Sequence, residues 1–70
     1  MFGAVLKELR EKVGLSQEEL AFRAGMDRSY ISQLERDKKS PTVQTLFRLC
    51  DALGTTPSRV LTRVERLMGR

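Results

Sequence analysis

The sequence contains no histidine and a single cysteine, Cys50, among its 70 residues. It therefore lacks the Cys/His ligand sets of zinc sites and the histidine that would activate a cysteine nucleophile. One cysteine rules out an internal disulfide and fits a reducing cytosol. No phosphate-binding glycine loop is present either. The sequence thus predicts no enzyme activity, no metal and no cofactor, and Cys50, which lies among leucines, is expected to be a small buried apolar residue.

Long apolar runs are also missing. No stretch approaches the roughly 20 apolar residues that a membrane-spanning helix needs, and no signal-peptide pattern opens the chain. We therefore expect a cytoplasmic protein that does not enter a membrane. Glycine and proline are few and fall between periodic segments, and no strand pattern or internal repeat appears. A chain of this length has room for one domain, residues 1–70, whose small core needs tight packing or a second copy for stability.

The charge is distributed unevenly along the chain. Residues 1–27 have a net charge of −1, residues 28–48 of +3 and residues 49–70 of +2, within a total of +4. The positive excess lies in the central and C-terminal segments, where it would suit a surface that binds a polyanion. A mildly basic, solvated helical surface would give the same totals, so charge alone does not separate the two interpretations.

Apolar residues at helical spacing predict a first helix over about residues 2–13. A second helix starts at a capping box, in which Ser16 is the N-cap and Glu19 follows three residues later. Asp27 is expected to cap a third helix. Two short helices joined by a tight turn form a helix-turn-helix, here over residues 17–36. An ordinary helical hairpin would show the same apolar stripe, so the spacing alone does not show that the two helices bind DNA.

The C-terminal part of the chain predicts two more helices. A fourth begins after Thr42 and stops at Gly54. A fifth covers about residues 57–68, with Thr56 as its cap and Pro57 in its first turn. Five helices with short connections make a compact all-α domain.

The outer face of the third helix supplies a second indication. At about 100° per residue, Ile31 and Leu34 lie on one side of this helix and a polar strip lies on the other. The strip consists of Arg28, Ser29, Ser32, Gln33 and Arg36. It contains no acid, and its side chains match base edges: arginine pairs with guanine, glutamine with adenine, and serine with either. This face favours DNA reading over a simple solvated surface.

Several short motifs together cover nearly the whole chain. They are GLSQEELA at 14–21, AGM at 24–26, YISQLER at 30–36, SPT at 40–42, ALG at 52–54 and Pro57. Their combination resembles the phage-repressor/Cro-type (XRE) helix-turn-helix family. The resemblance implies a five-helix, lambda-repressor-like domain that regulates transcription by binding double-stranded DNA. Phage repressors and the controller proteins of restriction-modification systems both have this size, and the sequence does not choose between them.

The resemblance also implies roles for individual residues. The base-reading positions are Arg28, Ser29, Ser32 and Gln33. The positions near the DNA backbone are Gln17, Arg36, Lys38 and Lys39, and Gln17 also braces the third helix. A structural ion pair is implied between Arg10 and Glu35.

Two residues leave alternatives open. Tyr30 either places its hydroxyl on a phosphate or fills the edge of the core. Asp37 departs from the family, in which a glycine commonly follows the third helix at a position that needs a left-handed backbone. An acid beside Lys38 and Lys39 would also reduce the attraction to phosphate. We expect a tolerated substitution, with Asp37→Gly stabilising the fold and tightening non-specific DNA binding.

The last helix carries more apolar residues than a small core needs. Its basic stripe consists of Arg59, Arg63, Arg66 and Arg70, and its predicted dimer interface of Val60, Val64, Leu67 and Met68. A two-fold homodimer would place two reading helices about 34 Å apart and require a near-palindromic operator. The alternatives are core packing with solvated arginines, or an antitoxin or adaptor in which this helix binds a protein partner.

Overall fold

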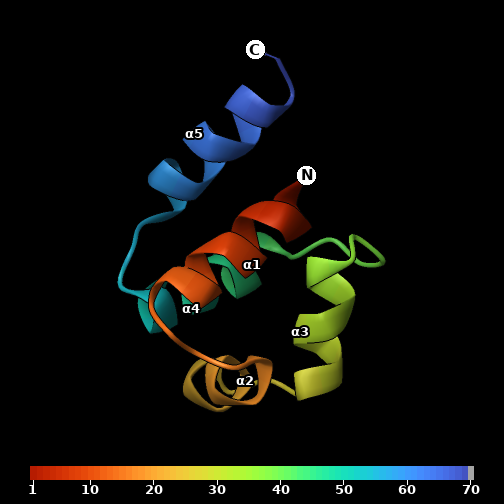
Figure 1. Ribbon diagram of the computed structural model, residues 1–70, viewed down its shortest axis with the longest axis vertical. Coiled ribbons are helices and arrows are strands. Elements are labelled where there is room, and N and C mark those ends of the chain that lie inside the picture. Colours follow the sequence, from red (N-terminus) through yellow and green to blue (C-terminus); the bar gives the residue numbers. More distant parts are fainter. Residues whose placement is uncertain (70) are drawn as a thin grey trace.

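Five α-helices pack around a small core in the computed structural model, which describes residues 1–69 (Figure 1). They are α1 (Phe2–Lys12), α2 (Gln17–Ala24), α3 (Arg28–Glu35), α4 (Val43–Leu53) and α5 (Pro57–Leu67). No strand occurs within those residues. The predicted all-α, five-helix domain is confirmed. None of the described helices is long and apolar enough to cross a membrane.

Local capping explains why most helices begin where they do. The Ser16 hydroxyl accepts from the Glu19 backbone N–H, and the Glu19 carboxylate accepts from the Ser16 N–H, so the predicted capping box is complete. Thr42 and Thr56 cap α4 and α5 in the same way, through the N–H three residues later. Asp27 occupies the N-cap position of α3 but makes no side-chain cap hydrogen bond. The predicted N-cap residue is therefore confirmed by position, but the side-chain hydrogen bond expected of an aspartate cap is not formed.

Two apolar clusters form the core. The larger one joins α1, α2, α3 and α4, and Leu20, Ile31 and Leu34 are completely buried at its centre. The smaller one joins α1, α4 and α5 through Val5, Leu46, Cys50 and Val60. Cys50 is a buried apolar residue, as predicted, and burial raises the pKa of its thiol above the ordinary value.

The arrangement of the helices places α3 at one edge of the molecule, with α2 crossing near one end and α5 on the far side of α1 (Figure 1). Gly25 ends α2 with a left-handed backbone (φ 69°), which allows the sharp turn into α3. The Arg48 guanidinium of α4 donates to the Gly25 carbonyl at 3.0 Å and links this turn to α4. The fold therefore holds α3 firmly at its base while leaving its outer face open.

Candidate nucleic-acid interface

The polar strip predicted on α3 faces solvent. Arg28, Ser29 and Arg36 are exposed and Ser32 and Gln33 are half-buried. Ile31 and Leu34, on the opposite side of the helix, are fully buried in the larger cluster. The helix is therefore divided into an apolar face that anchors it and a polar face whose donors and acceptors are available to a ligand.

The only carboxylate within α3 is removed from that face. Glu35 has a side chain only 3% exposed and pairs with Arg10 of α1, through Nε to Oε2 at 2.6 Å and Nη2 to Oε1 at 3.1 Å. Arg10 also donates to the Leu15 carbonyl at 2.8 Å. The hydrogen bond to Glu35 raises the pKa of Arg10, and burial opposes it. The ion pair that the family resemblance implied is present, and it leaves the outer face of α3 without an acid.

Gln17, the first residue of α2, joins this ion pair. Its Nε2 donates to Glu35 Oε1 at 3.1 Å. The bond fixes which way the amide points and links the start of α2 to the end of α3. An amide nitrogen carries two donors, and among residues 1–69 the second N–H of Gln17 has no hydrogen-bond partner.

Tyr30 within α3 and Arg36 at its C-cap both make contacts inside the domain. Tyr30 is half-buried and its ring packs against the larger cluster, which fits the core-edge interpretation. Arg36 lies along the helix, with Nε 3.4 Å from the Ser32 carbonyl. Arg36 is an exposed member of the polar strip and Tyr30 lies in α3, so both side chains are near the surface that would face a phosphate.

The segment after α3 differs from expectation at Asp37. This residue has the predicted left-handed backbone (φ 55°), but its carboxylate binds the start of α1. The hydrogen bonds from the Met1 amino group and the Gly3 N–H lower the pKa of Asp37. The residue thus makes specific contacts, beyond the tolerated substitution that we expected. Lys38 and Lys39, which follow it, are exposed.

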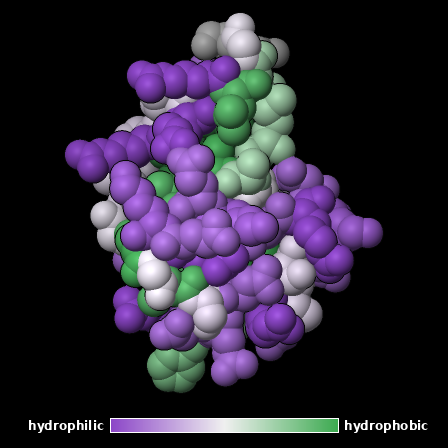
Figure 2. All heavy atoms as spheres, viewed as in Figure 1, coloured by the Kyte–Doolittle hydropathy of each residue, from purple (hydrophilic) through white to green (hydrophobic). Residues whose placement is uncertain are grey.

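The outer side of α5 carries exposed apolar residues, as Figure 2 shows at the top of the molecule, where α5 lies. Leu61 is 48% exposed, and Leu67 and Met68 are similarly open, while Val64 is half-buried. Val60 is only 3% exposed and belongs to the core, so its predicted place in a dimer interface is wrong. An ion pair between Arg63 and Glu8 fastens α5 to α1.

Sequence reasoning missed two apolar residues on α4. Val43 is 73% exposed and Phe47 is also exposed. On the helical wheel they lie about 20° and 60° from Cys50, which packs against Val60 of α5. Val43 and Phe47 therefore lie on the side of α4 next to α5, and they extend the exposed apolar residues of α5 onto α4. Of the predicted basic stripe on α5, Arg70 lies outside the described residues.

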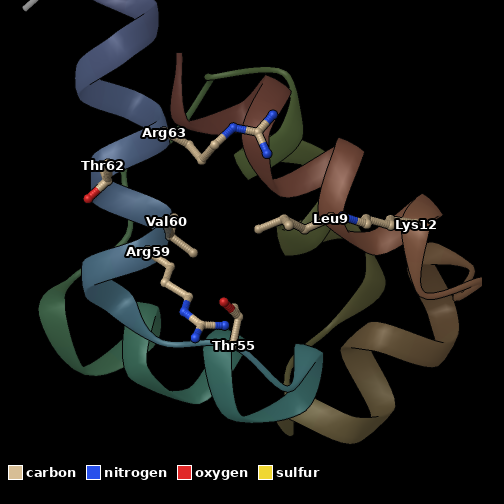
Figure 3. Close-up of a pocket in the computed structure, with 7 residues that line it drawn as sticks. All are labelled: Leu9, Lys12, Thr55, Arg59, Val60, Thr62 and Arg63. Carbon is tan, nitrogen blue, oxygen red and sulfur yellow. The ribbon is translucent and has the colours of Figure 1, made fainter.

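An open hollow lies between α1 and α5 (Figure 3). Its volume is about 350 Å³, and its lining residues are Leu9, Lys12, Thr55, Arg59, Val60, Thr62 and Arg63. No residue of α3 takes part, so the hollow is separate from the polar strip. Among residues 1–69, no three His, Cys, Asp or Glu side chains gather as metal ligands.

Comparison with known proteins agrees with this geometry. The helix-turn-helix family model matches residues 6–60. Control protein C.MunI from Mycoplasma sp is 38% identical over 66 residues, covering 93% of this chain and 89% of the relative. The restriction-modification controller protein C.AhdI from Aeromonas hydrophila has a TM-score of 0.82 at 42% identity, covering 84% of this chain and 89% of that one.

A third similar structure is that of the biofilm regulator SinR in complex with DNA. Its TM-score is 0.83 at 34% identity, and the match covers 87% of this chain and 98% of that one. The fold, the motifs and these relatives together show that the chain belongs to the phage-repressor/Cro-type (XRE) helix-turn-helix family of transcriptional regulators.

Proposed function

We propose that this protein is a sequence-specific regulator of transcription that binds double-stranded DNA with α3 in the major groove. The observation that carries the proposal is the acid-free outer face of α3, from which Glu35 is withdrawn into its ion pair with Arg10. An exposed carboxylate on that face would repel phosphates. Because the Glu35 carboxylate is buried, the arginine, serine and glutamine side chains of α3 are free to meet base edges. The protein would act in the cytoplasm as a binding protein and not as an enzyme.

The proposed DNA-contacting residues divide into two groups. Base reading is assigned to Arg28, Ser29, Ser32 and Gln33. Phosphate contacts are assigned to Gln17, Tyr30, Arg36, Lys38 and Lys39. Phosphate contacts set the position on the duplex and base contacts set the sequence preference, so the two groups give different mutant phenotypes. The free N–H of Gln17 suits a phosphate oxygen because the other N–H is already bound to Glu35.

We further propose that the protein binds as a homodimer through an apolar surface of α4 and α5, namely Val43, Phe47, Leu61, Val64, Leu67 and Met68. Most of these side chains are exposed in the single chain, and a core this small gains stability from a second copy. Two-fold symmetry would set the two α3 helices about 34 Å apart, which matches a near-palindromic operator.

The decisive experiment is selection from random duplexes with the wild type, Arg28→Ala and Gln33→Ala. Each variant is expected to relax one base position, because it removes a bidentate pairing with a base that is worth about 1–3 kcal/mol. Arg59→Ala is the matched control, because Arg59 is an exposed arginine on α5. A wild type that selects no sequence, or an Arg28→Ala variant with an unchanged preference, would contradict the proposal.

A second candidate is a protein-interaction module that uses the same apolar surface to hold a different protein. The exposure of Leu61 and Phe47 favours it. The two candidates differ in their salt dependence, because each phosphate neutralised by the protein contributes about −0.9 to the slope of log affinity against log salt. Absence of salt-dependent binding to duplex DNA would favour the second candidate.

A further inference from the structure

The first turn of α1 has no cap of its own. Its N-cap residue, Met1, makes no side-chain cap hydrogen bond, and no acidic residue lies in the first turn. The first N–H groups of a helix have no intrahelical partner and need an acceptor. Here the acceptor comes from far along the chain, because Asp37 Oδ1 lies 2.9 Å from the Gly3 nitrogen and Oδ2 lies 2.7 Å from the Met1 nitrogen.

The close contact between α1 and the end of α3 makes this possible. A Cβ added to Gly3 would lie 2.3 Å from the Glu35 carbonyl oxygen and 2.6 Å from that of Leu34. The backbone of α1 therefore rests directly on the last turn of α3, immediately before Asp37.

The backbone at Asp37 has the geometry of a Schellman motif. The Asp37 N–H donates to the Leu34 carbonyl at 3.1 Å, and the Lys38 N–H donates to the Gln33 carbonyl at 2.9 Å. Glycine is the usual residue at this left-handed position because it has no Cβ, whereas any other residue, aspartate included, is strained there to some degree. The bonds to α1 offset that strain and give a reason for aspartate at this position.

The same contacts determine where the Asp37 carboxylate lies. Both carboxylate oxygens of Asp37 are bound by donors at the start of α1, where the helix dipole is positive. Within residues 1–69, neither Lys38 nor Lys39 has an ion-pair partner. Lys38 and Lys39 therefore come immediately after a residue whose side chain is bound to α1, and their own charges are unpaired.

We propose that Asp37 is a positioning residue for DNA binding, which anchors the segment bearing Lys38 and Lys39 to α1 and holds its own charge away from the phosphates. The inference rests on the proposed function, because it assigns these lysines to the DNA backbone. It reverses the expectation from sequence that replacing Asp37 by glycine would improve binding.

Two substitutions separate positioning from simple charge. Asp37→Gly suits the left-handed backbone but removes the anchor, whereas Asp37→Asn tolerates that backbone and keeps a side-chain oxygen for the Gly3 N–H. Both remove the same negative charge, so simple electrostatics predicts that both tighten non-specific binding equally. Positioning predicts that Asp37→Asn binds at least as tightly as the wild type. Asp37→Gly binds more weakly, with a salt slope smaller in magnitude by about 1 to 2, one for each lysine.

The measurement is fluorescence anisotropy of a random-sequence duplex over a salt series, at a temperature where circular dichroism shows every variant folded. Adding Asp37→Gly to a Lys38→Ala/Lys39→Ala background is expected to weaken binding no further, because the anchored groups are already gone. Hydrogen exchange of the Gly3 amide reports the anchor without DNA. It is expected to accelerate in Asp37→Gly and to stay slow in Asp37→Asn.

The outcomes distinguish this inference from the function on which it rests. A wild type that shows no salt-dependent duplex binding would overturn both. A wild type that binds, with Asp37→Gly as tight as Asp37→Asn, would overturn the positioning role alone. Unchanged Gly3 exchange in Asp37→Gly would do the same, since the amide would then not depend on this carboxylate.

Discussion

At the scale of single residues, the ion pair between Arg10 and Glu35 is largely buried, with side chains that are 10% and 3% exposed. Removing one member of a buried pair leaves the other charge unpaired and typically costs about 3–5 kcal/mol. Glu35→Ala is therefore expected to lower the free energy of unfolding by about 3 kcal/mol, measured by urea denaturation, while the selected DNA sequence stays the same. Glu18→Ala, which removes an exposed carboxylate on α2, is the control and is expected to change stability by less than about 0.5 kcal/mol.

A double substitution sharpens this test. Replacing both charges, as in Arg10→Met/Glu35→Leu, is expected to recover much of the stability that Glu35→Ala removes, because apolar residues of similar size often replace a buried pair without cost. A stable Glu35→Ala variant with an altered base preference would show instead that Glu35 reads DNA.

Gly3 shows what single-residue reasoning from sequence could not detect. The apolar periodicity of α1 gives no sign that the end of α3 lies against Gly3. Gly3→Ala is expected to lower the free energy of unfolding by about 1–3 kcal/mol, because the new methyl group meets backbone that cannot move aside easily. Ala4→Ser, at an exposed position in the same turn, is the control for urea denaturation. Equal stability of wild type and Gly3→Ala would contradict the close contact.

At the scale of helices, local signals predicted most of the fold. Ser16, Thr42 and Thr56 define helix starts by hydrogen bonds that span three residues, so their effect is visible in a short window of sequence. The polar strip of α3 was predictable for the same reason, since periodicity is local. The anchor from Asp37 to Gly3 joins residues 34 apart and depends on how two helices meet. Apolar periodicity likewise could not separate Val60, which is buried, from its exposed neighbours on α5.

The capping box of α2 gives a prediction about acid stability. Hydrogen bonds with Ser16 lower the pKa of Glu19 from its ordinary value of 4.5. A lowered folded-state pKa means that the stabilisation is fully present above pH 4.5 and disappears as the pH falls through the lower folded value. Glu19→Gln keeps the acceptor but does not titrate, so its Tm is expected to fall less steeply with acid than that of the wild type. Glu18→Gln removes a neighbouring carboxylate outside the box and is the control; if both variants follow the wild-type curve, Glu19 does not contribute.

At the scale of the whole molecule, the single chain leaves an apolar surface on α4 and α5 open to water. The Arg63–Glu8 ion pair and Val60 hold α5 against the rest of the domain, so its outer side is presented on a fixed support. A glutamate placed within an apolar two-fold interface would meet its own copy and lose water without gaining a partner. Such a charge therefore acts twice in each dimer.

Leu61→Glu is accordingly expected to convert the protein from dimer to monomer at micromolar concentration, measured by analytical ultracentrifugation. Val13→Glu is the matched control, because Val13 is 51% exposed at the end of α1, against 48% for Leu61, and lies outside the surface. The monomeric variant is expected to retain salt-dependent binding to random duplex, since its α3 face is intact, but to lose preference for a palindrome over a single half-site. A wild type that sediments as a monomer, or a Leu61→Glu variant that remains dimeric, would show that two copies do not meet through this surface.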